Sequence, residues 1–218
     1  MNLMSRLSKL RNRNFEFDGS KDYWIRRYKS GSNSGGGSYG ILAEYKAKIL
    51  NDFVRENRIN SIIEFGCGDG NNLSSFNFPS YLGLDVSDFV ILKNRRKFKE
   101  NLNWAFMSLE DSRQFSFMAD LTLSLDVIYH LIEDEVYERY MAELFNSSIK
   151  FVIIYSSNTD FVTPAAHVRH RKFTKWVDLN RSNFELYKME ENPHKSELLG
   201  TEPNKSFADF FIFKNRLL

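Results

Sequence analysis

Apolar and polar positions follow two different periods along most of the chain. Between residues 41 and 57, apolar side chains recur at the three- and four-residue spacing of a helix that packs one face against a sheet. Short continuous apolar runs are typical of buried strands, and segments between them have a helical pattern; the strands are expected at 62–65, 81–84, 104–107, 119–125 and 150–156, and the helices at 89–97 and 133–145. Strands that alternate with helices predict a parallel sheet with helices on both faces.

The last two predicted strands break this alternation. Segments 184–189 and 207–213 are separated by PHKSELLGTEPNK, which contains two prolines and leaves no room for a crossover helix. Two strands joined in this way pair antiparallel. The predicted fold is therefore α/β, a Rossmann-like doubly wound sheet of seven strands, mostly parallel, with a C-terminal antiparallel hairpin.

Three glycines follow the first predicted strand directly. Gly66, Gly68 and Gly70 stand at alternate positions after residues 62–65, and Asp85 closes the next strand. A strand that turns sharply and lets a ligand approach its backbone favours residues without Cβ. This layout indicates a Rossmann-like nucleotide site, although a tight turn without a ligand is the alternative.

The charges of this turn favour one kind of nucleotide. A dinucleotide fingerprint has its third glycine one position later, where this chain has Asn71. Glu64 and Asp69 would repel a pyrophosphate, whereas they would attract the ammonium and sulfonium groups of S-adenosylmethionine. The sequence therefore predicts S-adenosylmethionine as the cofactor.

Residues 64–70, Glu-Phe-Gly-Cys-Gly-Asp-Gly, match the acidic-x-Gly-x-Gly-x-Gly motif of class I S-adenosylmethionine-dependent methyltransferases, which this chain resembles. The resemblance implies a methyltransferase domain over residues 41–218. Residues 1–40 are then expected to form an N-terminal extension with a lid over the Ser/Gly-rich residues 30–40, for which a plain linker is the alternative. Residues 1–15 are expected to be a loosely held terminus, with an amphipathic helix as the alternative.

The expected cofactor contacts follow the carboxyl ends of the strands, where ligands of doubly wound sheets bind. Asp85 has the right position to accept both ribose hydroxyls, although it could instead cap a helix, and Val86 can cover adenine. Family members usually place an acidic or polar group for the adenine amine after the third strand, where this chain has Met107 and Ser108. The cofactor-binding residues are expected to be Glu64, Gly66, Cys67, Gly68, Asn71, Asp85, Val86, Met107, Ser108 and Asp126.

The fourth strand leads to the expected acceptor side. In the resembled family, Asp126 borders the methionine end of the cofactor and the acceptor, and His130 faces the pocket. A hydroxyl acceptor benefits from a base with a pKa near 7, and His130 suits this catalytic role. The alternative for His130 is a hydrogen bond that seals the start of the next helix. Asp126 is not followed by two prolines and an aromatic residue, so methylation of nucleic-acid bases loses support.

A basic cluster, HVRHRK at residues 167–172, lies beyond the fifth strand and just before a predicted helix that contains Trp176. Such a cluster predicts an anion-binding surface, with a solvated basic loop as the alternative. The expected substrate-binding residues are Tyr39, His167, Arg169 and His170. No metal is expected, because the order of Asn158 and Asp160 departs from the cation site of catechol-type O-methyltransferases.

Segments WIRRY, NSGGGSYG, EFGCGDGN, SLDVIYH and HVRHRKF together resemble bacterial small-molecule methyltransferases found with surface-carbohydrate genes. This resemblance implies methyl transfer to an oxygen of a small, anionic acceptor of sugar, phosphate or phosphoramidate type. Two alternatives stay open. One is a nucleic-acid methyltransferase that uses residues 6–27 and 95–99 as a basic patch, and the other is a pseudoenzyme that only binds the cofactor.

Composition adds a few limits. A net charge of +2 and a pI near 8.5 are too mild to require nucleic acid or an anionic membrane as partner. Cys67 is the single cysteine, so no disulfide can form within the chain, and a reducing compartment is expected. The sequence has neither a long apolar run nor a signal-peptide core, so we expect a cytoplasmic protein without a membrane span. The oligomeric state is left open.

Overall fold

The computed structural model describes residues 17–196 and 202–217, and the predicted N-terminal segment 1–15 lies outside them. Within these ranges, no helix combines the length and the apolar character needed to cross a bilayer.

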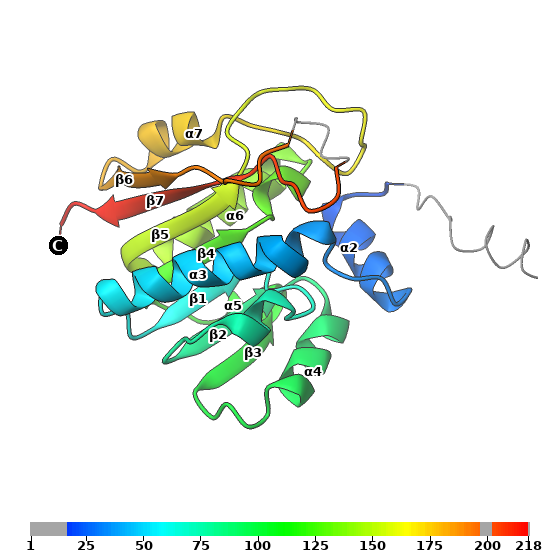
Figure 1. Cartoon of the computed structure of the whole chain (residues 1–218), viewed down its shortest axis with the longest axis horizontal. Coiled ribbons are helices and arrows are strands. Elements are labelled where there is room, and N and C mark those ends of the chain that lie inside the picture. Colours follow the sequence, from blue (N-terminus) through cyan, green and yellow to red (C-terminus); the bar gives the residue numbers. More distant parts are fainter. Residues whose placement is uncertain (1–16, 197–201, 218) are drawn as a thin grey trace, which may run out of the picture.

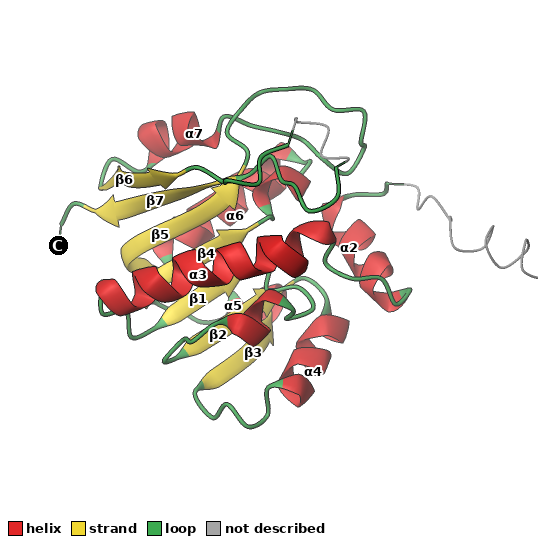
Figure 2. Ribbon diagram, viewed as in Figure 1, coloured by secondary structure: helices red, strands yellow, loops and turns green. Residues whose placement is uncertain are grey.

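One sheet organises the described residues, and its seven strands have the order β3-β2-β1-β4-β5-β7-β6 (Figures 1 and 2). Strands β1 to β5 pair in parallel, whereas β7 runs antiparallel to both β5 and β6. The predicted fold class is confirmed. The strands are β1 (Ile62–Phe65), β2 (Tyr81–Asp85), β3 (Trp104–Ser108), β4 (Ala119–Leu125), β5 (Ser148–Ser156), β6 (Phe184–Glu190) and β7 (Asp209–Asn215).

Helices cover both faces of this sheet, with α3 along one face and α6 along the other (Figure 1). The helical pattern over residues 41–57 forms α3. The helices are α2 (Ser20–Lys29), α3 (Gly40–Glu56), α4 (Asp88–Lys97), α5 (Leu109–Ser112), α6 (Asp134–Asn146) and α7 (Phe173–Asn180), with 3-10 turns η1 (Gly36–Ser38), η2 (Asn72–Ser75) and η3 (Ile128–His130).

The core has two layers because successive strand residues point to opposite faces of the sheet. On β5, Ile153 packs in the layer beneath α3, beside Leu50 and Phe53. Its neighbours Val152 and Ile154 pack in the layer beneath α6. Because β1 to β5 run in parallel, their carboxyl ends lie along one edge of the sheet.

The glycine turn after β1 is held by backbone bonds. The N–H groups of Gly66 and Cys67 both donate to the carbonyl of Leu84, at 2.7 and 2.9 Å. Gly66 has a φ of +84°, and a Cβ at this position would lie 2.6 Å from Val127 Cγ2. The turn therefore needs glycine both for its backbone conformation and for its close approach to the end of β4.

We expect Gly66→Ala to destabilise the protein more than Gly31→Ala, a matched control. Gly31 has nearly the same φ, +83°, but a Cβ there would meet nothing within 4 Å. The shared backbone strain costs about 1 kcal/mol, and the contact with Val127 adds about 1–3 kcal/mol for Gly66→Ala only. Urea denaturation of both variants measures the difference, and equal losses would contradict the steric account.

Candidate active site

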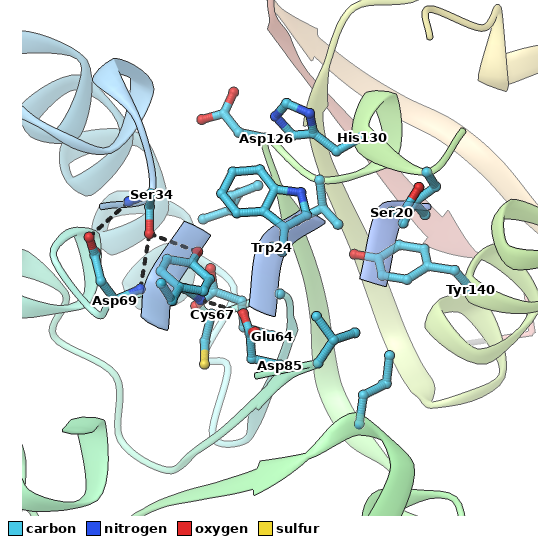
Figure 3. Close-up of a pocket in the computed structure, with 18 of the residues that line it drawn as sticks. Ser20, Trp24, Ser34, Glu64, Cys67, Asp69, Asp85, Asp126, His130 and Tyr140 are labelled. Carbon is cyan, nitrogen blue, oxygen red and sulfur yellow. Dashed lines mark hydrogen bonds between the residues drawn. The ribbon is translucent and has the colours of Figure 1, made fainter. Parts of the chain in front are cut away.

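A cavity of about 110 Å³ lies at the carboxyl edge of the sheet, between the ends of β1, β2 and β4 and the helix α2 (Figure 3). Most of the predicted cofactor residues line it together with the predicted catalytic histidine: Glu64, Gly66, Cys67, Gly68, Asn71, Asp85, Val86, Asp126 and His130. The structure thus brings together residues that the sequence separates by more than sixty positions.

The two residues expected at the adenine end do not line the cavity. Ser108 Oγ accepts a hydrogen bond from Asp111 N–H at 3.0 Å, so this side chain caps α5. Met107 packs against the apolar layer beneath α6. Leu109 and Arg113, just beyond the strand, line the cavity in their place.

Asp85 is buried and accepts two backbone hydrogen bonds. Its Oδ2 accepts from Gly68 N–H at 3.0 Å, and its Oδ1 accepts from Ser87 N–H at 2.9 Å. Burial raises the pKa of Asp85 to about 6, although these N–H groups partly offset the effect. Each carboxylate oxygen has a further acceptor site, so Asp85 can bracket the turn and still bind ligand hydroxyls.

Glu64 is also buried, and the Tyr81 hydroxyl donates to its Oε2 at 2.5 Å. Burial raises the pKa of Glu64 to about 7, against the opposing effects of Tyr81 and of the Lys46 charge. Its carboxyl group is therefore divided between neutral and ionised forms near neutral pH. A bound cation would favour the ionised form.

Asp69 has a different role from the one expected. Its Oδ2 accepts from Ser34 N–H at 2.9 Å and from the Tyr39 hydroxyl at 2.7 Å, while Ser34 Oγ accepts from Asp69 N–H at 3.0 Å. Burial would raise the pKa of Asp69, but these hydrogen bonds outweigh it and the pKa is lowered. Asp69 therefore fastens the Ser/Gly-rich segment onto the glycine turn, and Tyr39 points to Asp69 instead of lining the cavity.

We call residues 20–39 the strap; it comprises α2, the Ser/Gly-rich segment and η1. Its first residue is fastened as well, because Ser20 donates to Glu133 through both its backbone N–H (2.9 Å) and its hydroxyl (2.6 Å). Between the two fastenings, Trp24 meets the ring of His130 edge-on at 4.8 Å (Figure 3). The strap thus closes the cavity from the side opposite the sheet.

Six cavity residues belong to the strap, and none of them was predicted from the sequence: Ser20, Lys21, Trp24, Tyr28, Ser34 and Ser38. The aromatic residues around the Arg26-Arg27 pair were the available signal. In α2 these aromatic residues alternate with charged residues, and the helix buries only three side chains. The sequence therefore shows no clear apolar stripe there.

His130 is held in one tautomer. Its Nδ1 lies 2.8 Å from the carbonyl oxygen of His167, which can only accept, so Nδ1 carries the proton and Nε2 keeps a lone pair. Burial lowers the pKa of His130 to about 4, so the expected pKa near 7 is wrong. The imidazole is neutral at physiological pH.

The basic cluster does not form the expected anion-binding surface at the cavity. His167 stacks on Tyr23 at 4.8 Å, and Arg169 pairs with Asp134 at 2.9 Å. His170 is buried, with Nδ1 2.6 Å from Ser157 Oγ. None of these basic side chains lines the cavity, because the cluster's partners are groups of the fold itself.

In residues 17–196 and 202–217, no three His, Cys, Asp or Glu side chains gather in a way that could hold a metal ion. Burial raises the pKa of the Cys67 thiol, so it stays protonated.

No protein-family model matches the chain. Its structure is similar to that of the N-methyltransferase NodS from Bradyrhizobium japonicum with S-adenosylhomocysteine, at a TM-score of 0.67 and 13% identity over 91% of this chain and 99% of that one. It is also similar to magnesium protoporphyrin IX methyltransferase from Synechocystis with S-adenosylhomocysteine, at a TM-score of 0.64 and 14% identity over 89% and 97% of the two chains. The chain has the fold of class I S-adenosylmethionine-dependent methyltransferases.

A curated relative of this methyltransferase fold is the small RNA 2'-O-methyltransferase of Arabidopsis thaliana. It is 25% identical over an alignment of 173 positions that covers 72% of this chain. The matched region spans 18% of the length of that protein. Relatives of this fold thus methylate different acceptors, and the fold alone does not select among them.

The raised pKa of Glu64 predicts a pH-dependent stability. Because the folded-state pKa of about 7 exceeds the ordinary value of 4.5, Glu64 contributes stability below pH 4.5 that is lost as the pH rises through 7. Glu64→Gln mimics the neutral form at every pH. We therefore expect the melting temperature of the variant minus that of wild type to be about 5 °C higher at pH 8 than at pH 5. Calorimetry at both pH values measures this. A constant difference would contradict the assignment, since Asp85 titrates in both proteins.

Proposed function

We propose that this chain is a cytoplasmic S-adenosylmethionine-dependent methyltransferase that methylates an oxygen of a small, anionic acceptor in surface-carbohydrate biosynthesis. The observation that carries the proposal is the cavity itself. It joins a glycine turn, two buried carboxylates and a neutral histidine at the edge of a methyltransferase fold.

The residues present fit the cofactor. Gly66 and Gly68 place backbone without side chains at the cavity wall, and Asp85 keeps acceptor sites for ribose hydroxyls. Val86 and Leu109 supply apolar surface for adenine. When bound, S-adenosylmethionine supplies a methyl group on a cationic sulfur, and the sulfur keeps the electron pair of the broken bond as a neutral thioether.

His130 supports an oxygen acceptor. Its Nε2 lone pair can accept the proton of a hydroxyl as the acceptor oxygen bonds to the methyl carbon. Because its pKa is only about 4, His130 first orients the hydroxyl by accepting its hydrogen bond. It takes the proton when the acceptor oxygen bonds to the methyl carbon. An acceptor that is already an anionic oxygen would need only the orienting hydrogen bond.

Nearby cations support an anionic acceptor. Lys21 lines the cavity and pairs with Glu110 at 3.2 Å, and Arg27 is close enough to His130 to help lower its pKa. His167, Arg169 and His170, the residues expected for this role, do not line this cavity, and Arg169 and His170 line a separate surface pocket instead. The acceptor contacts are therefore proposed to come from the strap.

The small cavity beneath the strap supports a small acceptor, and the way the strap is held supports its role as a lid. Ligand sites usually measure about 300–1,000 Å³, well above this cavity of 110 Å³. The strap must therefore open to admit a nucleoside, and its polar fastenings at Glu133 and Asp69 suit such a movement. We propose residues 41–218 as the methyltransferase domain and the strap as its lid.

Removing His130 tests the proposal. His130→Ala should bind S-adenosylmethionine within about threefold of wild type in calorimetry and lose at least about 100-fold in turnover, since a positioned base contributes about 10²–10⁴-fold. Turnover is followed as S-adenosylhomocysteine release with a panel of anionic cell-envelope precursors. His194→Ala, which removes a histidine outside the cavity, is the matched control.

The pH profile separates this account from one with a base of pKa 7. The rate with a hydroxyl acceptor should stay level down to about pH 5. Full activity of His130→Ala would contradict the proposed role of His130 at the acceptor site. No binding of S-adenosylmethionine by wild type would remove the whole proposal.

An RNA hydroxyl is the second candidate acceptor, and the similarity to the plant small RNA 2'-O-methyltransferase favours it. Helices α2 and α4, which both carry basic residues, contact each other, whereas residues 6–16 of the expected patch lie outside the described residues. This candidate predicts methyl transfer to single-stranded RNA, with binding that falls steeply with salt. Lys29→Glu with Arg96→Glu should weaken it more than Lys48→Glu on α3.

A further inference from the structure

Lys46 is a buried charge that no sequence motif indicates. Its side chain on α3 is fully buried, and its Nζ lies 2.5 Å from Asp126 Oδ2 and 5.1 Å above the ring of Tyr155. A buried ammonium needs a charged partner, because it has lost its hydration. Asp126 provides this partner, and it also lines the cavity with 12% of its side chain exposed.

Asp126 is held in an uncommon conformation. Its φ is +60°, in the left-handed region that residues other than glycine seldom adopt. Three bonds keep it there: Lys46 binds Oδ2, the Tyr129 hydroxyl donates to Oδ1 at 2.9 Å, and the backbone N–H donates to Tyr155 O at 3.0 Å. Such conformations persist where surrounding groups fix them, and they concentrate at functional sites.

The strap closes directly onto this fixed carboxylate. A Cβ on Gly37 would lie 2.9 Å from Asp126 Oδ2, so the backbone of η1 approaches as closely as a residue without a side chain allows. The carboxylate is held between Lys46, Tyr129 and the strap. The negative end of the ion pair therefore stands at the cavity wall, and the positive end lies behind it.

We propose that Lys46 is a positioning residue that orients Asp126 so that the site favours the cationic cofactor over its neutral thioether product. The inference rests on the proposed function, since it concerns the same cofactor. A negative group a few ångströms from the sulfur stabilises the sulfonium and gives nothing to the thioether. The site then binds the methyl donor tightly and releases the product easily.

Affinities for the two ligands test this proposal without any acceptor. In Lys46→Met/Asp126→Asn, both side chains keep their size without charge, and asparagine tolerates a positive φ. We expect calorimetry to give about tenfold weaker binding of S-adenosylmethionine and less than about threefold weaker binding of S-adenosylhomocysteine. Asp126→Asn alone leaves the ammonium unpaired and should show a larger selective loss.

Melting temperatures check the pairing itself. Lys46→Met alone leaves Asp126 without its counter-ion and should lower the melting temperature by about 10 °C, most of which the double variant regains. Lys150→Met/Asp120→Asn is the matched control, because this ion pair, 3.1 Å long, includes an aspartate of 13% exposure at the opposite end of β4. The control should leave both ligand affinities unchanged.

Two results would overturn the inference. One is unchanged binding of both ligands by a folded double variant. The other is that the double variant and Asp126→Asn each lose as much affinity for S-adenosylhomocysteine as for S-adenosylmethionine. Either would make the pair a purely structural element. Failure of the wild-type protein to bind either ligand is a different outcome, because it would remove the proposed function on which the inference rests.

Discussion

The site depends on the compensation of four carboxylates that the fold gathers around one small cavity. Burial opposes the ionised forms of Glu64, Asp69 and Asp85, and each of the four carboxylates has different compensating partners. Glu64 has a pKa raised to about 7, Asp85 receives backbone N–H groups, Asp69 receives the strap, and Asp126 pairs with Lys46. The result is a cavity wall that is less negative than the count of acidic residues suggests. Because its pKa is about 7, Glu64 can ionise when a cation binds beside it.

The general fold could be predicted because its signals are local. Strand β4, ADLTLSL, alternates apolar and polar residues, is buried throughout, and begins and ends where expected. The missing crossover before the last strand predicts the antiparallel hairpin. The glycines after β1 likewise mark a conformation that few other residues adopt. Such patterns depend on neighbours within a few positions, which a sequence displays directly.

The strap could be predicted only in part. The composition of residues 30–40 indicates a mobile segment or a lid, but the bond from Ser34 to Asp69 joins positions 35 apart. Helix α2 lacks the apolar stripe that identified α3, and its aromatic residues alone did not indicate that it lies over the cavity. The role of Lys46 could not be predicted for the same reason, since its partner Asp126 lies 80 positions away.

The basic cluster illustrates the limit of reading charge from composition. Arg169 and Arg171 look like an anion site in the sequence, yet both bind Asp134, and Arg171 also donates to the carbonyl of Leu131. Whether a cation faces a ligand or its own fold depends on groups from another element. In this protein those groups come from the start of α6, which lies more than thirty residues earlier.

The central claim is that a buried carboxyl group beneath a glycine turn selects a cationic adenosyl donor. Calorimetric titration of the wild-type protein with S-adenosylmethionine and with NAD at pH 6 and pH 8 tests it most directly. The account predicts binding of S-adenosylmethionine that is tighter at pH 8, because Glu64 ionises near pH 7, and no binding of NAD. Tight binding of NAD, with no heat from S-adenosylmethionine at either pH, would contradict it.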